Sequence, residues 1–146
     1  MVDGRPILIL LVEDDDAHAE IVRRNLESSR VLNRIVHVAD GQAALDYLLR
    51  EGSYADPASS PRPDLILLDL RLPKVDGLEV LRRLKASPEL QAIPTVVLTT
   101  SAAEADLIGA YASGAASYVV KPVDYQKFTE LMEAFGFYWL AWNRYP

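Results

Sequence analysis

The stretch "LILLDLRLPKVDG", residues 65–77, runs from an unbroken apolar segment into a carboxylate. Its first residues, Leu65–Leu68, lack the polar alternation of a half-exposed strand, which is the pattern of a parallel strand covered on both faces. Asp69 follows directly and precedes Leu70 and Arg71. A charge at the end of a buried strand needs a physical reason, so Asp69 is the first candidate functional residue.

Short apolar runs like this one alternate along the chain with amphipathic segments. The expected strands are Ile7–Val12, Ile35–Val38, Leu65–Leu68, Val96–Leu98 and Tyr118–Val120. Apolar residues at helical spacing predict four helices, and a fifth helix is expected to begin near Asp124. The four are His18–Ser28, Gln42–Arg50, Leu78–Lys85 and Ala103–Ala112. This alternation, with right-handed crossovers, predicts an α/β fold with an open, doubly wound, five-stranded parallel sheet.

Capping residues agree with these helix assignments. Asp40 can cap the second helix, and Ser101 with Glu104 has the spacing of a capping box at the start of the fourth. Asp15 and Asp16 are best interpreted as a cap and a favourable charge at the start of the first helix.

Composition limits the class of protein. The length of 146 residues predicts one domain, and the 50% share of hydrophobic residues predicts that it folds. The absence of cysteine excludes disulfides and thiolate metal sites. The formal net charge of −6 argues against nucleic acid as a partner. The run Ile7–Val12 is too short to span a membrane and lacks a secretory cleavage site, so we expect no membrane partner and a cytoplasmic location.

Polar residues follow four of the five expected strands at the same point. They are the run Glu13–Asp16 after the first strand, Asp69 after the third, Thr99, Thr100 and Ser101 after the fourth, and Lys121 with Pro122 after the fifth. Doubly wound sheets bind ligands at the carboxyl ends of their strands, where these groups are expected to meet. The sequence therefore brings carboxylates, a hydroxyl and an ammonium to one edge of the sheet.

This combination of side chains suits phosphoryl chemistry. Carboxylates brought together repel one another and call for a cation, and oxygen ligands without a thiol or a nearby histidine suit Mg²⁺. An aspartate can itself attack a phosphoryl group, while Mg²⁺, a lysine and a hydroxyl hold its oxygens.

Each residue also has a simpler interpretation. Asp69 alone could be a helix cap or a turn former, and Lys121 could be a surface lysine. Thr99 could be an ordinary strand residue, with Thr100 or Ser101 supplying the hydroxyl instead. His18 and His37 lie in no motif, and we interpret them as surface or strand residues rather than phosphate carriers.

Four motifs in this order resemble the receiver domain of two-component response regulators. They are "LLVEDD", "LLDLRLPKVDG", "VVLTTS" and "ASYVVKP", and the resemblance covers nearly the whole chain. It implies a flavodoxin-like (βα)5 fold with strand order 2-1-3-4-5. It also implies a response regulator in phosphorelay signalling rather than an enzyme with turnover on a separate substrate.

The resemblance assigns the acidic residues to phosphate and metal. Asp69 would accept the phosphoryl group from a phosphohistidine of a sensor kinase. Asp14 and Asp69 would bind Mg²⁺ directly, with Mn²⁺ as an alternative ion. Glu13 would act on the metal through water, and the backbone carbonyl of Arg71 would be a further ligand.

The remaining roles implied by the resemblance concern phosphoryl binding and switching. Thr99 and Lys121 would hold the phosphoryl oxygens. Tyr118 would be the ring that moves when Thr99 is drawn to the phosphate, with a half-buried strand aromatic as the alternative. The bond before Pro122 is a candidate cis peptide. The face made by the fourth helix, the fifth strand and the fifth helix would carry the output.

Two regions go beyond the expected core of residues 6–134. Residues 50–64 form a long connection rich in proline and serine, of unassigned role. Residues 135–146, "FGFYWLAWNRYP", contain both tryptophans. These rings could wrap their own domain, or they could form a homodimer surface together with the output face. We expect no output domain after them.

The long connection, the "LTTS" stretch and the aromatic tail narrow the resemblance to stand-alone receivers partnered with bacterial phytochrome kinases. The narrower resemblance implies a light-sensing histidine kinase as the upstream partner.

Two other classes of protein fit the sequence less well. A Mg²⁺-dependent phosphatase would need an acid where Arg71 stands, and a phosphate-independent binding module is disfavoured because no member of the expected site is missing.

Overall fold

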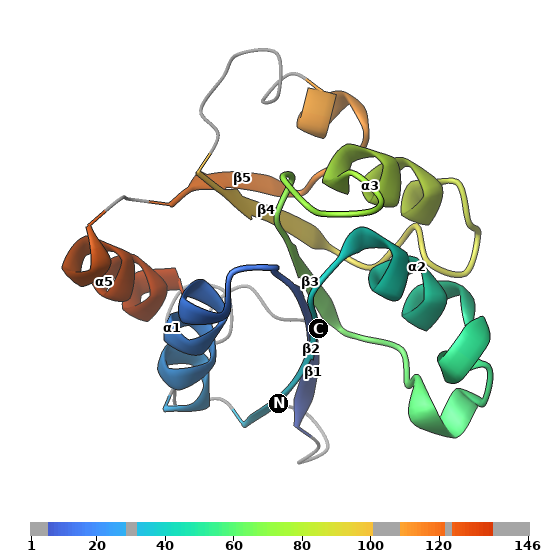
Figure 1. Ribbon diagram of the computed structural model, residues 1–146, viewed down its shortest axis with the longest axis horizontal. Coiled ribbons are helices and arrows are strands. Elements are labelled where there is room, and N and C mark those ends of the chain that lie inside the picture. The colour runs from blue at the N-terminus through green and yellow to red at the C-terminus, as the bar shows by residue number, and fades with distance from the viewer. Residues whose placement is uncertain (1–5, 29–31, 101–108, 122–123, 136–146) are drawn as a thin grey trace.

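The computed structural model describes residues 6–28, 32–100, 109–121 and 124–135, and these form a five-stranded sheet between helices (Figure 1). The strands are β1 (Ile7–Val12), β2 (Asn33–Val38), β3 (Leu65–Leu68), β4 (Thr95–Thr99) and β5 (Ser117–Val120). All neighbouring pairs are parallel, and the order is β2-β1-β3-β4-β5. The predicted doubly wound fold and its strand order are confirmed.

Helices cover both faces of this sheet. They are α1 (Asp16–Glu27), α2 (Gly41–Leu49), α3 (Gly77–Lys85) and α5 (Tyr125–Phe135), and residues 109–112 are also helical. The helix α1 packs beside α5 on one face, and α2 packs beside α3 on the other (Figure 1). Ser101, Glu104 and most of the fourth predicted helix lie outside the described residues, as do Pro122 and the aromatic segment 136–146.

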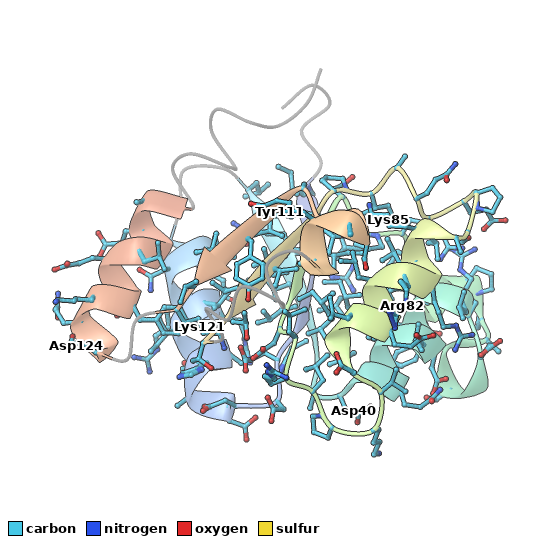
Figure 2. The ribbon with its side chains drawn as sticks, turned by 90° about the horizontal axis from the view of Figure 1, so that it is seen from above. Asp40, Arg82, Lys85, Tyr111, Lys121 and Asp124 are labelled. Carbon is cyan, nitrogen blue, oxygen red and sulfur yellow. The ribbon has the colours of Figure 1, made fainter. Side chains whose placement is uncertain are left out.

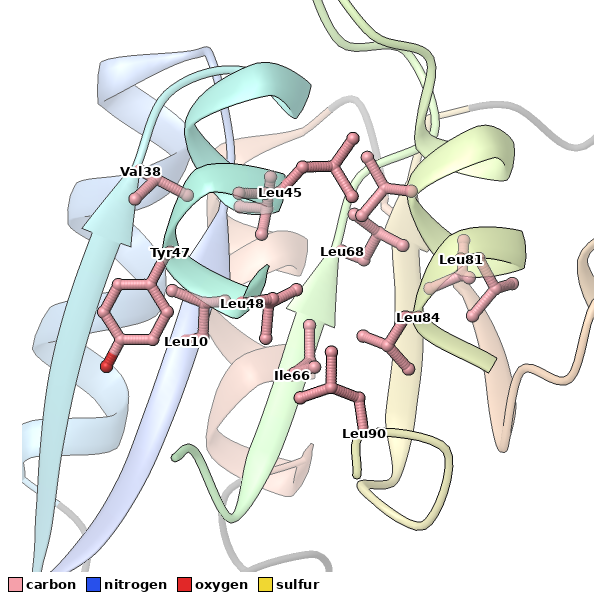
Figure 3. Close-up of a cluster of buried hydrophobic side chains, with 14 of the residues drawn as sticks. Leu10, Val38, Leu45, Tyr47, Leu48, Ile66, Leu68, Leu81, Leu84 and Leu90 are labelled. Carbon is pink, nitrogen blue, oxygen red and sulfur yellow. The ribbon is translucent and has the colours of Figure 1, made fainter. Parts of the chain in front are cut away.

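The central strands β1 and β3 are buried along their whole length because they feed two hydrophobic cores. Alternate side chains of a strand point to opposite faces of the sheet. Leu10 and Ile66 therefore belong to the core under α2 and α3, shown in Figure 3, while Ile9 and Leu67 belong to the core under α1 and α5. This double coverage explains why neither strand has a polar position before its carboxyl end.

Aspartates lie at the starts of α1, α2, α3 and α5, and in α5 the side chain of Asp124 accepts from the amide of Lys127 at 3.0 Å. Asp15 accepts hydrogen bonds from the amides of Ala17 and His18, so α1 begins before the predicted His18. Asp40 caps α2 as predicted, and Asp76 caps α3 through the amide of Leu78. A side-chain oxygen satisfies amides that the first turn of a helix leaves without intrahelical partners.

The connection between α2 and β3 is folded onto its own domain. It contains two short 3₁₀ turns, Gly52–Tyr54 and Pro57–Ser59. The buried hydroxyl of Ser60 donates to the carbonyls of Tyr54 and Asp56 at 3.1 and 3.2 Å. The hydroxyl of Tyr47, on α2, donates to the carbonyl of Pro61 at 2.6 Å. The bonds of Ser60 hold the turns of the segment together, and the bond of Tyr47 fastens the segment to α2.

None of the helices in the described ranges is long and apolar enough to cross a membrane.

Close backbone packing at Gly77 fixes the loop that follows β3. The amide of Gly77 donates to the carbonyl of Leu70 at 3.0 Å. A Cβ at this position would lie 2.3 Å from the carbonyl oxygen of Asp69 and 2.6 Å from the Cα of Leu70. Because the obstructing atoms are backbone, only glycine allows α3 to begin this close to Asp69.

We predict that Gly77→Ala lowers the free energy of unfolding by about 1–3 kcal/mol or more, because the loop must move to admit the methyl group. Gly109→Ala is the matched control, since among the residues that the structure describes its Cβ would meet the flexible Leu78 side chain, at 3.4 Å. This control should leave stability unchanged or raise it by up to about 1 kcal/mol through helix propensity. Urea unfolding of both variants measures the difference, and equal stabilities would contradict the packing argument.

Candidate functional site

The polar residues singled out in the sequence lie together at one edge of the sheet. This edge is formed by the carboxyl ends of β1, β3, β4 and β5. Glu13, Asp69, Thr99 and Lys121 are 1%, 6%, 0% and 2% exposed, respectively. Asp14 is exposed beside them. Most ionisable side chains stay in water unless they are paired, so burying three of them at one place marks a site rather than a surface.

The acidic residues of this site form a candidate metal centre. Ligand oxygens of Glu13, Asp14 and Asp69 all lie within 4.8 Å of one another. Carboxylate oxygens without nitrogen or sulfur ligands are the donors that Mg²⁺ and Mn²⁺ prefer. The donor set therefore fits the hard divalent cation expected from the sequence.

Lys121, labelled in Figure 2, is paired with two of these carboxylates. Its ammonium donates to Glu13 Oε1 and, at 3.1 Å, to Asp69 Oδ2. Its backbone amide donates to the carbonyl of Thr99 at 2.8 Å, which continues the β4–β5 ladder to the lysine. The ammonium is thus delivered to the carboxylates by the pairing of two strands.

Burial dominates the electrostatics of Glu13. Loss of water raises the pKa of its carboxyl to about 7, although the ammonium of Lys121 acts in the opposite direction and the charge of Asp69 adds to the rise. With Glu13 ionised, as it would be beside a bound cation, the three carboxylates and the ammonium of Lys121 have a formal net charge of −2. A divalent cation matches that residual charge.

The backbone holds Asp69 at the end of β3. Its amide donates to the carbonyl of Val12 at 3.1 Å, and its Oδ1 accepts from the amide of Arg71 at 3.0 Å. The loop beyond is tied to α2, because the amide of Gly41 donates to the carbonyl of Pro73 at 3.2 Å. The carboxylate and the Arg71 backbone are therefore positioned together.

The two predicted switch residues lie on neighbouring strands. Thr99 ends β4 and is paired in register with Val120 of β5. Tyr118 is half-buried on β5, and its ring centroid lies 6.4 Å from that of the exposed Tyr111. The sequence analysis did not single out Tyr111. The candidate cis bond at Pro122 lies outside the described residues.

His18 lies at the site, a position that its sequence context did not predict. Its Nδ1 lies 3.0 Å from the Lys121 ammonium, and its ring packs edge-on against Phe128 of α5 with centroids 5.2 Å apart. His37 is a strand residue, as interpreted, with Nε2 2.7 Å from the carbonyl oxygen of Glu13. One feature of the sequence could have indicated this position, because His18 falls in the first turn of the helix that follows Glu13 and Asp14.

This chain belongs to the response regulator receiver domain family, whose model matches residues 9–133. Receiver domains are signalling domains of two-component systems that take phosphoryl groups from histidine kinases and bind Mg²⁺ or Mn²⁺ at the acidic site.

Two individual relatives are similar to this chain over most of their own length. The chain is 48% identical over 142 residues to the probable methanogenesis regulatory protein FilR2 of Methanothrix harundinacea, covering 97% of this chain and 88% of that protein. It is 41% identical over 135 residues to the response regulator Rcp1 of Synechocystis, covering 92% and 90% of the two chains.

Two solved structures are similar over nearly their whole length. The Mn²⁺-bound form of Rcp1 has a TM-score of 0.91 at 40% identity, covering 97% of this chain and 99% of that one. The phosphorylated cyanobacterial phytochrome response regulator RcpA has a TM-score of 0.88 at 37% identity, covering 97% and 98%.

We predict that Lys121→Met lowers the free energy of unfolding of the metal-free protein by about 3–5 kcal/mol, because two buried carboxylates lose their cation. Lys127→Met is the matched control, since Lys127 is exposed on α5 and should change stability by less than about 0.5 kcal/mol. Thermal and urea unfolding in the presence of a chelator measure both variants. An equal loss of stability in the two variants would contradict the role of Lys121 as the cation paired with these carboxylates.

Proposed function

We propose that this receiver domain accepts a phosphoryl group on Asp69 from a sensor histidine kinase and thereby switches its binding to partners. The observation that carries the proposal is the contact of the Lys121 ammonium with both Asp69 and Glu13, beside the exposed Asp14. This contact supports the proposal, because the residues proposed as nucleophile, metal ligands and phosphate-binding cation are neighbours.

The proposed transfer is a displacement at phosphorus. A carboxylate oxygen of Asp69 forms the new P–O bond while the P–N bond to the donor's histidine breaks, and the electron pair leaves with that nitrogen. Mg²⁺, when bound, neutralises charge on the transferring oxygens. Asp14 and Asp69 would hold it directly, Glu13 through water, and the carbonyl of Arg71 as a further ligand.

Lys121 changes partners in this proposal. In the described structure its ammonium is paired with Glu13 and Asp69, a role that a bound metal would take over. The ammonium can then donate to a phosphoryl oxygen, and the hydroxyl of Thr99 can donate to another. Movement of Thr99 toward the phosphate leaves space for the Tyr118 ring, which would transmit the change to the face that carries Tyr111.

We predict that the wild-type chain gains one phosphoryl group from acetyl phosphate only when Mg²⁺ is present, and that Asp69→Asn gains none. Intact-mass spectrometry measures the gain directly. Asp56→Asn is the matched control, because Asp56 caps a 3₁₀ turn in the 50–64 connection, where asparagine also caps well. A wild-type protein that is natively folded but takes no phosphoryl group from either acetyl phosphate or a kinase would overturn the proposal.

A histidine kinase of the phytochrome type is the proposed donor. RcpA is a phytochrome response regulator, and two other similar structures, at 43% and 42% identity, are bacteriophytochrome response regulators. The same mass experiment therefore uses a phosphorylated phytochrome kinase as a second donor, with a light-insensitive histidine kinase for comparison. Faster transfer from the phytochrome kinase supports the assignment. FilR2, which is also similar to this chain, is named as a methanogenesis regulator, so a partner other than a phytochrome is the alternative. Faster transfer from the light-insensitive kinase would support that alternative and would leave the proposed chemistry at Asp69 unchanged.

We also propose that the chain forms a homodimer through the face that carries residues 109–112, β5 and α5, together with the aromatic C-terminus. Tyr111 and Val120 are 51% and 42% exposed on this face. Tyr118 and Val120 point to the same side of β5 because they are two residues apart. Large exposed apolar side chains in one place are typical of an interface.

We predict that Tyr111→Glu weakens self-association at least about tenfold, because a central aromatic is replaced by a charge. Leu32→Glu is the control, since Leu32 is also exposed, at 58%, but lies at the entrance to β2 on the opposite edge of the sheet. Sedimentation equilibrium measures both dissociation constants. An unchanged constant for Tyr111→Glu would place the interface elsewhere.

A further inference from the structure

The ammonium of Lys121 has a third neighbour that the phosphoryl chemistry does not use. Besides Glu13 Oε1 and Asp69 Oδ2, it lies 3.0 Å from Nδ1 of His18. An ammonium has hydrogen atoms to donate and no lone pair to accept with, so Nδ1 must be the acceptor and the ring proton sits on Nε2. The imidazole is thus an uncharged acceptor for the cation of the site.

The surroundings of His18 favour this neutral acceptor state. Burial lowers the pKa of His18, and the charge of Lys121 lowers it further, against opposing effects of Asp15, Asp69 and Asp14. The imidazole is therefore mainly neutral at pH 7 and able to accept through Nδ1.

The ring itself is held in place between two helices. It meets the ring of Phe128 of α5 edge-on, at an interplanar angle of 90° and a centroid distance of 5.2 Å. The backbone amide of His18 donates to Asp15 Oδ1 at 3.1 Å, which anchors the first turn of α1. The Lys121 ammonium lies 6.0 Å from the centroid of the same Phe128 ring. The packing of the imidazole ring against Phe128 therefore holds Nδ1 in position.

The three contacts of Lys121 differ in what happens to them during the proposed transfer. Two of its acceptors, on Glu13 and Asp69, belong to the metal centre and the nucleophile. The third, on His18, carries no charge and takes no part in metal binding or in bond formation. It can keep one N–H of the ammonium occupied and so hold the nitrogen beside Asp69 while the other two N–H groups change partners.

We propose that His18 is a positioning residue for Lys121, which keeps the ammonium aimed at the phosphoryl oxygens of Asp69. This inference rests on the proposed function, because it concerns the rate of phosphoryl transfer to Asp69. It adds a part of the site that lies on α1 and that none of the four sequence motifs contains.

The test compares His18→Asn with His18→Leu in the full chain. The two replacements have nearly the same shape and remove the same outer atoms of the ring beside Phe128, but only asparagine offers an acceptor at about the same distance from Cβ as Nδ1. The rate of phosphoryl transfer from acetyl phosphate at saturating Mg²⁺ is followed by intact mass. Arg24→Ala, at an exposed position of α1, is the control for the helix itself.

We predict that His18→Leu slows the transfer roughly three- to tenfold, the effect of losing one hydrogen bond, and that His18→Asn keeps a rate within about twofold of wild type. A purely structural role would slow both variants or neither. Equal rates for the two variants, whether slow or fast, would therefore overturn the positioning role.

A second measurement separates this inference from the proposed function, because it needs no phosphoryl donor. In the unphosphorylated protein, Lys121→Met should move the Nδ1 signal of His18 in ¹⁵N NMR, since the acceptor loses its donor. An unmoved signal would overturn the contact even if Asp69 is phosphorylated. A moved signal in a protein that takes no phosphoryl group would support the contact while the proposed function fails.

Discussion

Burial of β1 and β3 on both faces is the constraint on which the rest of this structure depends. Each strand supplies alternate side chains to two separate cores, so every position along it must be apolar. Polar chemistry is thereby confined to the points where the strands end. Because parallel strands all end at the same edge, residues far apart in the chain, such as Glu13 and Lys121, come into contact there.

The same burial makes the site electrostatically demanding. Glu13 and Asp69 lose most of their hydration, and the rise in the pKa of Glu13 to about 7 reflects the cost of keeping a charge there. A single ammonium does not neutralise the acidic residues fully, so the arrangement favours a divalent cation over the absence of one. The demand for positive charge is thus a product of the fold, and it would link metal binding to the proposed chemistry of Asp69.

Periodicity and strand-end arguments predicted the parts of the molecule that depend on local sequence. The five strands and the chemistry at their ends follow from patterns within a few residues, and Asp40 was recognised as a cap from its position alone. The strand order needed the family resemblance, because alternation of strands and helices is compatible with several orders. His18 was missed because its contacts come from the far end of the chain, at Lys121 and Phe128, and no local pattern reports a contact across more than 100 residues.

The bond between the Lys121 amide and the Thr99 carbonyl limits how this domain can respond to a ligand. It continues the ladder of β4 and β5, and a slip of that ladder by one residue would turn every side chain of β5 to the opposite face of the sheet. Such a slip would also carry the lysine out of the site. A one-residue slip of β5 would therefore disrupt both the sheet face and the site, so the register of β4 and β5 is expected to stay fixed when the domain binds a ligand.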